Sequence, residues 1–369
     1  MLENYRIRNY NFKLLLLVLT AGIFGTLMIN SADSSYLKKQ VLGLCICLTG
    51  LIVLSLIDYK FISKFYAILY GINIVLLSCV HLFGSSANGA TRWLGSDDLI
   101  KIQPSEFSKI ILIICAARFL SEHKDNINTF KTLVSYAIFC AIPLALIVSQ
   151  PDLSTTIDIF IILLVMLFIA GLNYKIIGIA LLCVIPLTGS FVWYIRQPNP
   201  MFIKDYWVQR ILAFLYPEDY TSTTRYQQDN SVMAIGSGQL WGKGLNTSTL
   251  ATVKDANLIS EQQTDFIFSV VGEELGFVGS ILIIVILGLI VIQCIRTARK
   301  ANDDMGMFIA TGVATLIGFQ TFINIGVATA LLPNTGIPLP FISYGLSSLV
   351  SSCAAIGLVM NISLQRRKY

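Results

Sequence analysis

The sequence has few charged residues and almost no histidine. Of its 369 residues, 13% are Asp, Glu, Lys or Arg, whereas a soluble domain has roughly 25%. The two histidines, His81 and His123, lie in separate segments. A Ser-His-Asp hydrolase and a histidine-based metal site are therefore disfavoured. Any catalytic role falls to carboxylates, lysines and arginines.

Cysteine and net charge exclude further classes. All eight cysteines fall in apolar segments and none forms a Cys-x-x-Cys pair, so we expect neither a zinc site nor a disulfide in the polar part of the chain. The net charge of +5 predicts no nucleic-acid partner, because the basic residues gather at one set of segment ends. What remains is apolar: 55% of residues are hydrophobic, and the mean hydropathy is +0.72.

Ten apolar segments are each close to the length of about 20 residues that crosses a bilayer. We therefore predict an all-α integral membrane protein, a bundle of ten transmembrane helices forming a single polytopic domain over residues 1–369. The first segment is interpreted as a retained span and not as a signal peptide. The segments are 13–31, 40–57, 61–83, 105–121, 132–149, 153–171, 174–195, 266–296, 305–332 and 343–364.

An even number of spans places both termini on one side, and the Lys/Arg bias chooses the side. With both termini cytoplasmic, the short outer loops hold only Lys38, Lys39, Arg92 and Lys101. We therefore predict a multi-pass membrane protein with both termini in the cytoplasm. The cytoplasmic ends then hold Arg6, Arg8, Lys13, Lys60, Lys64, Arg118, Lys124, Lys131, Lys175, Arg296, Arg299, Lys300, Arg366, Arg367 and Lys368.

One large polar loop, residues 196–265, faces outward in this topology. It contains a predicted amphipathic helix over 206–216, whose Trp207, Ile211, Phe214 and Leu215 are expected on the bilayer surface, and a second helical piece over 226–235. The following segment 266–296 would be about 46 Å long as a helix. Since the hydrocarbon core is about 30 Å thick, its first turns should stand above the membrane.

The loop also contains a Gly-rich stretch, residues 236–244, with Lys243 between two glycines. The spacing differs from a P-loop and no strand precedes it, so nucleotide binding is disfavoured. Lys243 is a candidate phosphate contact, but a flexible turn is the favoured interpretation.

Ionisable residues in or beside the spans are the candidate functional groups. Glu106 and Lys109 are three residues apart on one helical face and are expected to pair. Asp152 and Asp265 each precede a span, so each is either a helix cap or first-turn acid, or a functional acid. Glu273, with Glu274, is either functional or paired with a basic group.

Several strings of residues, in this order, resemble those of the SEDS family, which comprises RodA, FtsW and SpoVE, and the resemblance runs along nearly the whole chain. They are Asn88-Gly-Ala-Thr-Arg92-Trp93-Leu94, Gln103-Pro-Ser-Glu106-Phe-Ser-Lys109, Ser149-Gln150-Pro-Asp152-Leu-Ser154-Thr155, Ala234-Ile-Gly-Ser-Gly238 with Gly242-Lys243-Gly244, Thr264-Asp265-Phe-Ile-Phe268 with Glu273-Glu274-Leu-Gly276, and Gly336-Ile-Pro338-Leu-Pro340-Phe-Ile-Ser343-Tyr-Gly345.

The resemblance implies ten transmembrane helices and a peptidoglycan glycosyltransferase of the bacterial plasma membrane. It also implies lipid II and an undecaprenyl-linked glycan as substrates, and a class B penicillin-binding protein as partner. Gln263, Leu346 and Thr91 depart from frequent family residues, which bears on the branch of the family to which the chain belongs. The short tails and the string Gly336-Ile-Pro338-Leu-Pro340 weakly favour a RodA type. The family's essential acid falls on Asp265, and its other polar positions, expected to bind substrate, fall on Arg92, Gln103, Glu106, Lys109, Asp152, Lys243, Glu273 and Ser343.

The expected chemistry is an inverting transfer in which Asp265 removes a proton from the attacking sugar hydroxyl. Arg92, Lys109 and Lys243, or a divalent cation such as Mg²⁺ or Mn²⁺, would stabilise the leaving pyrophosphate. Two alternatives stay open: a lipid II flippase or other transporter, since buried charges also suit a translocation path, and a scaffold that only activates a penicillin-binding protein.

Overall fold

The structure is a computed structural model that describes residues 9–87, 90–95, 101–197, 205–216, 223–246, 252–253 and 258–365. Five basic residues used for the orientation, Arg6, Arg8, Arg366, Arg367 and Lys368, lie outside the described residues.

Each of the ten predicted spans falls on a helix, and the span predicted over 61–83 is divided in two at Phe65. Among the described residues, seven helical stretches are long and apolar enough to cross a membrane. The membrane class is thereby confirmed, while the count of ten stays a prediction. The helices on these segments are α1 (Phe12–Ala32), α2 (Leu37–Leu56), α3 (Tyr59–Lys64), α4 (Tyr66–Phe83), α5 (Pro104–Glu122), α6 (Phe130–Ser149), α7 (Leu153–Ile169), α8 (Tyr174–Ile195), α11 (Ile267–Arg299), α12 (Asp304–Ala328) and α13 (Leu346–Leu364).

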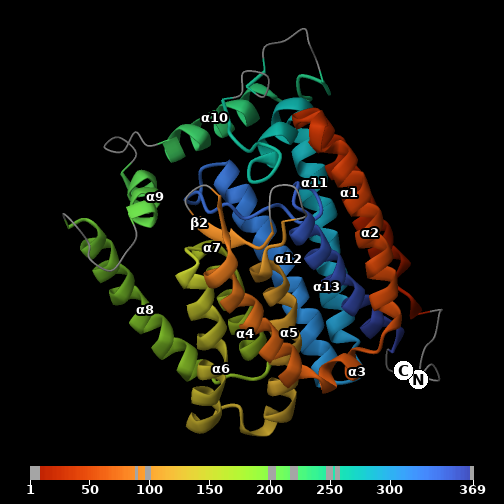
Figure 1. The fold of residues 1–369 in the computed structure, drawn as a ribbon, viewed down its shortest axis with the longest axis vertical. Coiled ribbons are helices and arrows are strands. Elements are labelled where there is room, and N and C mark those ends of the chain that lie inside the picture. Colours follow the sequence, from red (N-terminus) through yellow and green to blue (C-terminus); the bar gives the residue numbers. More distant parts are fainter. Residues whose placement is uncertain are drawn as a thin grey trace.

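The bundle has an inner helix and a lipid-facing rim (Figure 1). Almost all of α13 is buried, and this helix packs against α2, α12 and α5. Most of its polar residues are serines, and such small side chains let neighbouring membrane helices approach closely. The outer helices α1, α2, α4 and α6 bury a narrow stripe and expose large apolar side chains such as Leu16 and Ile68. So much exposed apolar surface is unfavourable in water, but it suits contact with lipid.

The two ends of the described chain meet at one end of the bundle, where the Ser363 hydroxyl donates to the Asn9 carbonyl at 3.3 Å. This agrees with the even number of spans that the sequence predicts.

A short antiparallel hairpin interrupts the otherwise helical fold. Strands β1 (Ser85–Ala87) and β2 (Ala90–Trp93) pair, and Leu94 forms a further bridge with Ile102. The sequence analysis did not predict this hairpin, because strands of three and four residues are too short to show a period of two. The hairpin matters because it carries Arg92 to the start of α5.

The two helices predicted in the large loop are confirmed as α9 (Asp205–Leu215) and α10 (Thr223–Ser237). Helix α10 is anchored to the end of α12, because the Ser231 hydroxyl donates to the Ala328 carbonyl at 2.7 Å and the Gln228 amide donates to the Val327 carbonyl at 3.0 Å. The side chain of Trp207 lies outside the described residues, so its predicted place on the bilayer surface remains a prediction.

The long span α11 is broken at Gly276, whose φ of 64° and ψ of −159° are not helical. At the break, the Phe277 amide donates to the carbonyl of Gln239, at 2.8 Å. A Cβ atom on Gly238 would lie 1.9 Å from the Gly272 carbonyl oxygen. The Gly-rich stretch forms the predicted turn, and it is packed closely against α11. Glycines are needed there because two backbones touch.

Candidate active site

Asp265 lies in the turn that leads into α11, two residues before the helix begins. The capping position is Phe266, and neither a side-chain cap nor a first-turn acid is present at this helix start. The interpretation of Asp265 as a helix cap is therefore wrong, which leaves its carboxylate available for another role.

The backbone around Asp265 is held by three hydrogen bonds from the segment that joins α12 to α13 and from α12 itself. The carbonyls of residues 263–265 accept, in order, from the Tyr344 amide at 2.8 Å, the Ser343 hydroxyl at 2.6 Å and the Asn324 side-chain amide at 2.8 Å. We call these three donors the carbonyl clamp. Because the clamp binds backbone atoms, it fixes the position of Asp265 without neutralising its carboxylate.

Burial raises the pKa of Asp265 from its ordinary value of 3.8 to about 6. The positive charge of Arg210 opposes this rise, Glu261 adds to it, and Arg92 opposes it more weakly. A carboxylate with a pKa close to the working pH is suited to accept a proton and release it again. Arg210 is held by the Asn334 carbonyl at 3.0 Å.

Gly336 allows the segment between α12 and α13 to approach this carboxylate. Its φ is 75°, and a Cβ atom there would lie 3.2 Å from Oδ2 of Asp265. Only glycine adopts this conformation readily.

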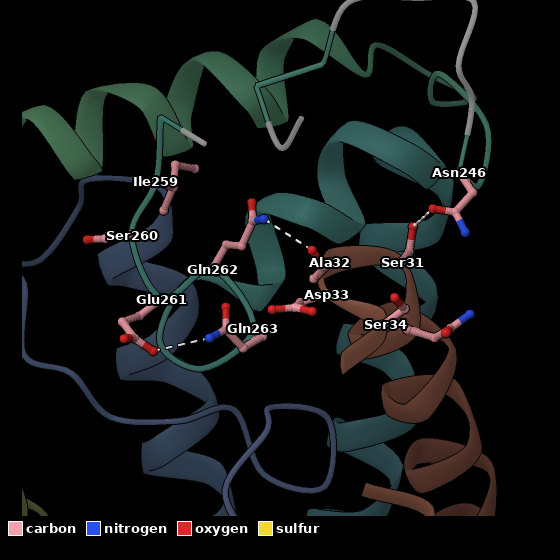
Figure 2. A pocket seen from close by; sticks show the side chains of 11 residues that line it. Ser31, Ala32, Asp33, Ser34, Asn246, Ile259, Ser260, Glu261, Gln262 and Gln263 are labelled. Atoms are coloured by element: carbon pink, nitrogen blue, oxygen red, sulfur yellow. Dashed lines mark hydrogen bonds between the residues drawn. The ribbon is translucent and has the colours of Figure 1, made fainter. Parts of the chain in front are cut away.

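The loop that carries Asp265 also borders a polar pocket next to the turn between α1 and α2 (Figure 2). The Gln262 side-chain amide donates across to the Ala32 carbonyl at 3.3 Å. The loop is therefore supported on one side by the clamp and on the other side by α1.

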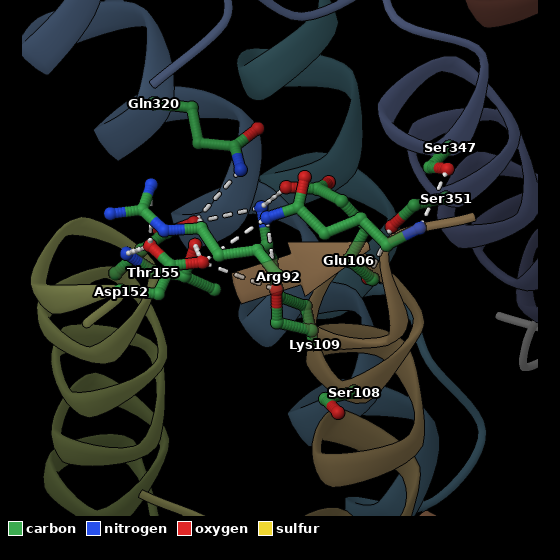
Figure 3. Close-up of polar contacts among 12 residues, drawn as sticks. Arg92, Glu106, Ser108, Lys109, Asp152, Thr155, Gln320, Ser347 and Ser351 are labelled. Carbon is green, nitrogen blue, oxygen red and sulfur yellow. Dashed lines mark hydrogen bonds and ion pairs between the residues drawn. The ribbon is translucent and has the colours of Figure 1, made fainter. Parts of the chain in front are cut away.

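A buried polar network joins the start of α5 to the start of α7 (Figure 3). Asp152 caps α7 by accepting from the Thr155 amide at 3.2 Å, which confirms the predicted cap. The same carboxylate accepts from the Gln103 amide at 3.1 Å and lies 3.7 Å from the Arg92 guanidinium, which also donates to the Pro151 carbonyl. Asp152 is thus both a cap and a member of the network.

Deeper in the bundle, Lys109 bonds to two carboxylates. Its ammonium nitrogen lies 2.7 Å from Glu106, which confirms the predicted pair, and 3.4 Å from Asp158. Asp158 also accepts from the Gln320 amide at 2.8 Å. All four side chains are buried, so each charge has an opposite charge or a hydrogen-bond donor beside it, as low-dielectric surroundings require.

Lys243 and Glu273 form a further group, with an Nζ to Oε1 distance of 2.7 Å. Glu273 also accepts from the Val253 amide at 2.8 Å, and Glu274 accepts from the Ser31 hydroxyl at 2.5 Å. The prediction that these acids pair is confirmed for Glu273. Glu273 lies six residues beyond Ile267, the first residue of α11, about 9 Å along the helix axis at 1.5 Å per residue.

The structure thus collects the predicted site residues into three groups. Asp265 lies with Ser343. The α5–α7 network contains Arg92, Gln103, Glu106, Lys109 and Asp152. Lys243 lies with Glu273.

The sequence analysis missed Asp158, Asn324 and Arg210. Asp158 is an acid inside the apolar segment 153–171. An ionisable residue within a predicted span is the signal that selected Glu106, so the same signal could have selected Asp158. Asn324 and Arg210 were not, because a neutral amide in a span and an arginine in a long loop have many ordinary roles.

In the part of the chain that the structure describes, no group of three or more His, Cys, Asp or Glu side chains is placed to hold a metal ion. We therefore derive no step through a cation held by the protein alone.

The chain is similar to known proteins over almost its whole length. Residues 10–368 match the family described as "Cell cycle protein", FtsW/RodA/SpoVE. The chain is 34% identical to the probable peptidoglycan glycosyltransferase FtsW of Geobacter metallireducens, covering 98% of this chain and 96% of the relative. It is 32% identical to the peptidoglycan glycosyltransferase MrdB of Escherichia coli K12, covering 96% and 93%.

Two solved chains share the fold. One, from work described as "Structural coordination of polymerization and crosslinking by a peptidoglycan synthase complex", has a TM-score of 0.80 and 26% identity and covers 96% of this chain and 97% of its own length. The other is the rod shape determining protein RodA of Thermus thermophilus, with a TM-score of 0.70, 24% identity and 98% coverage of both chains.

Proposed function

This chain belongs to the FtsW, RodA and SpoVE family, and on that premise we propose that it polymerises lipid II into glycan strands, with Asp265 as the catalytic base. It is a peptidoglycan glycosyltransferase and a multi-pass bacterial membrane protein. The observation that carries the choice of residue is that Asp265 is anchored through its backbone while its carboxylate has a pKa raised to about 6.

The proposed orientation places both termini in the cytoplasm and the loop of α9 and α10 outside the cell. The distribution of lysine and arginine supports this orientation. Asp265 then opens to the side on which cell wall is built, and the lipid tails of both substrates lie between the helices.

In the proposed reaction, the 4-hydroxyl of the N-acetylglucosamine on lipid II attacks the first sugar of a growing glycan lipid. Asp265 takes the hydroxyl proton as the new C–O bond forms. The bond to undecaprenyl pyrophosphate breaks, and this group leaves with the electron pair. Single displacement converts an α-linked donor into a β-linked product, by analogy with inverting glycosidases.

The negative charge that builds on the leaving pyrophosphate needs cations nearby. Arg92 suits this role because its side chain is 20% exposed and its positive charge lowers the pKa of Asp265. Arg210, which the sequence analysis did not select, suits it for the same electrostatic reason. Lys109 is enclosed between two carboxylates at 2% exposure, so we assign it to holding the α5–α7 network in place.

A divalent cation remains part of the proposal as a companion of the pyrophosphate, because Mg²⁺ takes most of its ligands from phosphate and water. We expect EDTA to reduce the polymerisation rate at least tenfold and Mg²⁺ or Mn²⁺ to restore it. A rate unchanged in EDTA would remove the cation from the proposal. Thermal unfolding of the protein should be the same with and without EDTA.

We propose a class B penicillin-binding protein as partner, supported by the likeness to a chain of a peptidoglycan synthase complex. We keep the flippase as the second candidate function, because the buried charges Glu106, Lys109 and Asp158 also suit a translocation path.

The deciding experiment reconstitutes the full chain, with and without its partner, in vesicles that contain fluorescent lipid II. Polymerisation predicts glycan chains on a gel. A flippase predicts movement of lipid II between leaflets without chains, and a scaffold predicts neither. Chains formed with a partner whose own polymerising ability is absent would support the proposal, and movement without chains would contradict it.

A further inference from the structure

A polar cavity of about 620 Å³ lies between the turn that joins α1 to α2 and the loop that carries Asp265 (Figure 2). Residues 30–34 form one wall and residues 259–263 form the other, with Asn246 at the side. Its volume lies in the range of known ligand sites, about 300–1,000 Å³. None of the groups assigned above to the proton or the pyrophosphate lines it.

The walls are rich in hydrogen-bonding groups of low charge. They present the side-chain amides of four residues and the hydroxyls of three, with Ile259 as the one large apolar contact. The two carboxylates, Asp33 and Glu261, each accept one hydrogen bond: Asp33 from the Ser35 amide at 2.9 Å, and Glu261 from the Gln263 amide at 3.1 Å. No lysine or arginine is among the described lining residues, so the cavity repels phosphate groups.

One buried wall group points to a missing hydrogen bond. Gln262 is 6% exposed and donates to the Ala32 carbonyl, but its side-chain oxygen accepts no hydrogen bond from any residue that the structure describes. That oxygen is itself buried, so a ligand in the cavity would first meet the other amides and hydroxyls of the walls.

The cavity is connected directly to the proposed base. Glu261, which has a left-handed φ of 57°, begins the turn, and its carbonyl accepts from the Thr264 amide at 3.1 Å. Glu261 also raises the pKa of Asp265. An occupant of the cavity would therefore contact the loop within four residues of the base.

We propose that this cavity binds an unphosphorylated amino-sugar segment of the glycan strand, as a saccharide subsite behind the catalytic loop. The hydroxyl and acetamido groups of such a segment match the amides and hydroxyls of the walls. A segment of amino sugars would also fill the cavity, which a single ammonium group would not. The inference rests on the proposed function, because the glycan is its substrate or product.

The test uses a matched pair of tryptophan substitutions in the full chain. Ser34 lines the cavity, whereas its neighbour Ser35 does not, and both are exposed. Ser34→Trp should fill the cavity, and Ser35→Trp should leave it open. The probe is tetra-N-acetylchitotetraose, a soluble glycan without lipid or phosphate, and its binding is measured by calorimetry.

We expect wild type and Ser35→Trp to bind the probe with equal Kd, and Ser34→Trp to bind at least tenfold more weakly. Gln262→Leu, which keeps the size but removes a polar side chain from the wall, should also weaken binding and serves if Ser34→Trp does not fold. No binding by wild type, or equal binding by every variant, would overturn the proposal. So would displacement of the probe by Nα-acetyl-lysine amide at equal concentration, since that result would indicate an ammonium site.

Lipid II polymerisation by the same preparations separates the two failures. If wild type makes chains but no variant changes probe binding, the saccharide subsite is wrong and the proposed function stands. If the probe binds as expected but wild type makes no chains with its partner, the function is wrong and the cavity remains a saccharide site.

Discussion

The catalytic loop and the α5–α7 network both hold carboxylates, but they hold them in opposite ways. In the network, the carboxylates of Glu106 and Asp158 are bound directly by Lys109. In the loop, the clamp binds the backbone of residues 263–265, and burial leaves the Asp265 carboxylate with a raised pKa. A neutralised acid supports structure, whereas an acid held by its backbone keeps its charge available for proton transfer.

The largest expected effect is on the network. Lys109→Met removes the cation that two buried carboxylates share, so we expect about 3–5 kcal/mol of destabilisation, measured as the free energy of unfolding in detergent. The control lies on the same helix: Arg118 pairs with Glu122 at 2.7 Å, and both are 38% exposed. Arg118→Met should cost about 0.5 kcal/mol or less. Equal losses in both variants would contradict the distinction between buried and exposed pairs.

Breaking the clamp should lower the rate while the fold remains stable. Asn324→Ala removes the donor to the Asp265 carbonyl, and a misplacement of about 1 Å can cost about 10²-fold in rate. We expect kcat for polymerisation to fall by about 10- to 100-fold with little change in KM. Thr321→Ala is the control, because its hydroxyl bonds only to the Ile317 carbonyl of its own helix among the contacts that the structure describes. A normal kcat for Asn324→Ala would remove the clamp from the account.

The pH dependence tests the raised pKa. Because Asp265 must be ionised to accept a proton, the polymerisation rate should rise with pH and level off above about 6. Arg210 lowers this pKa, so Arg210→Gln should move the midpoint to higher pH. Arg225→Gln, which breaks an ion pair on α10, should leave the midpoint in place. An identical midpoint in all three proteins would show that Asp265 does not set the profile.

The pH dependence of thermal stability tests the raised pKa of Asp265 without an activity assay. The folded pKa of Asp265 is raised above the ordinary 3.8, so its contribution to stability is fully present below about pH 3.8 and is lost as pH rises through about 6. Asp265→Asn should therefore gain thermal stability relative to wild type when the pH is raised from 4 to 7. A difference in Tm that is independent of pH would contradict the raised pKa.

Periodicity and charge predicted the helices well because apolar length is what a bilayer demands. Each predicted span falls on a helix, and the Glu106–Lys109 pair follows from spacing alone. The break at Gly276 and the packing of the Gly-rich stretch did not follow, because they depend on two distant backbones that meet in space. The clamp is equally non-local: Asn324 is 59 residues from the carbonyl to which it donates.

The most direct test of the central claim compares two Asp→Asn substitutions in lipid II polymerisation by the purified protein with its partner. Asp265→Asn keeps the shape of the side chain and removes the base, and Asp229→Asn makes the same change at an exposed ion pair on α10. With both variants folded, we predict that Asp265→Asn loses about 10²- to 10⁴-fold in rate while Asp229→Asn polymerises like wild type. Glycan chains made by Asp265→Asn at the wild-type rate would show that the base lies elsewhere.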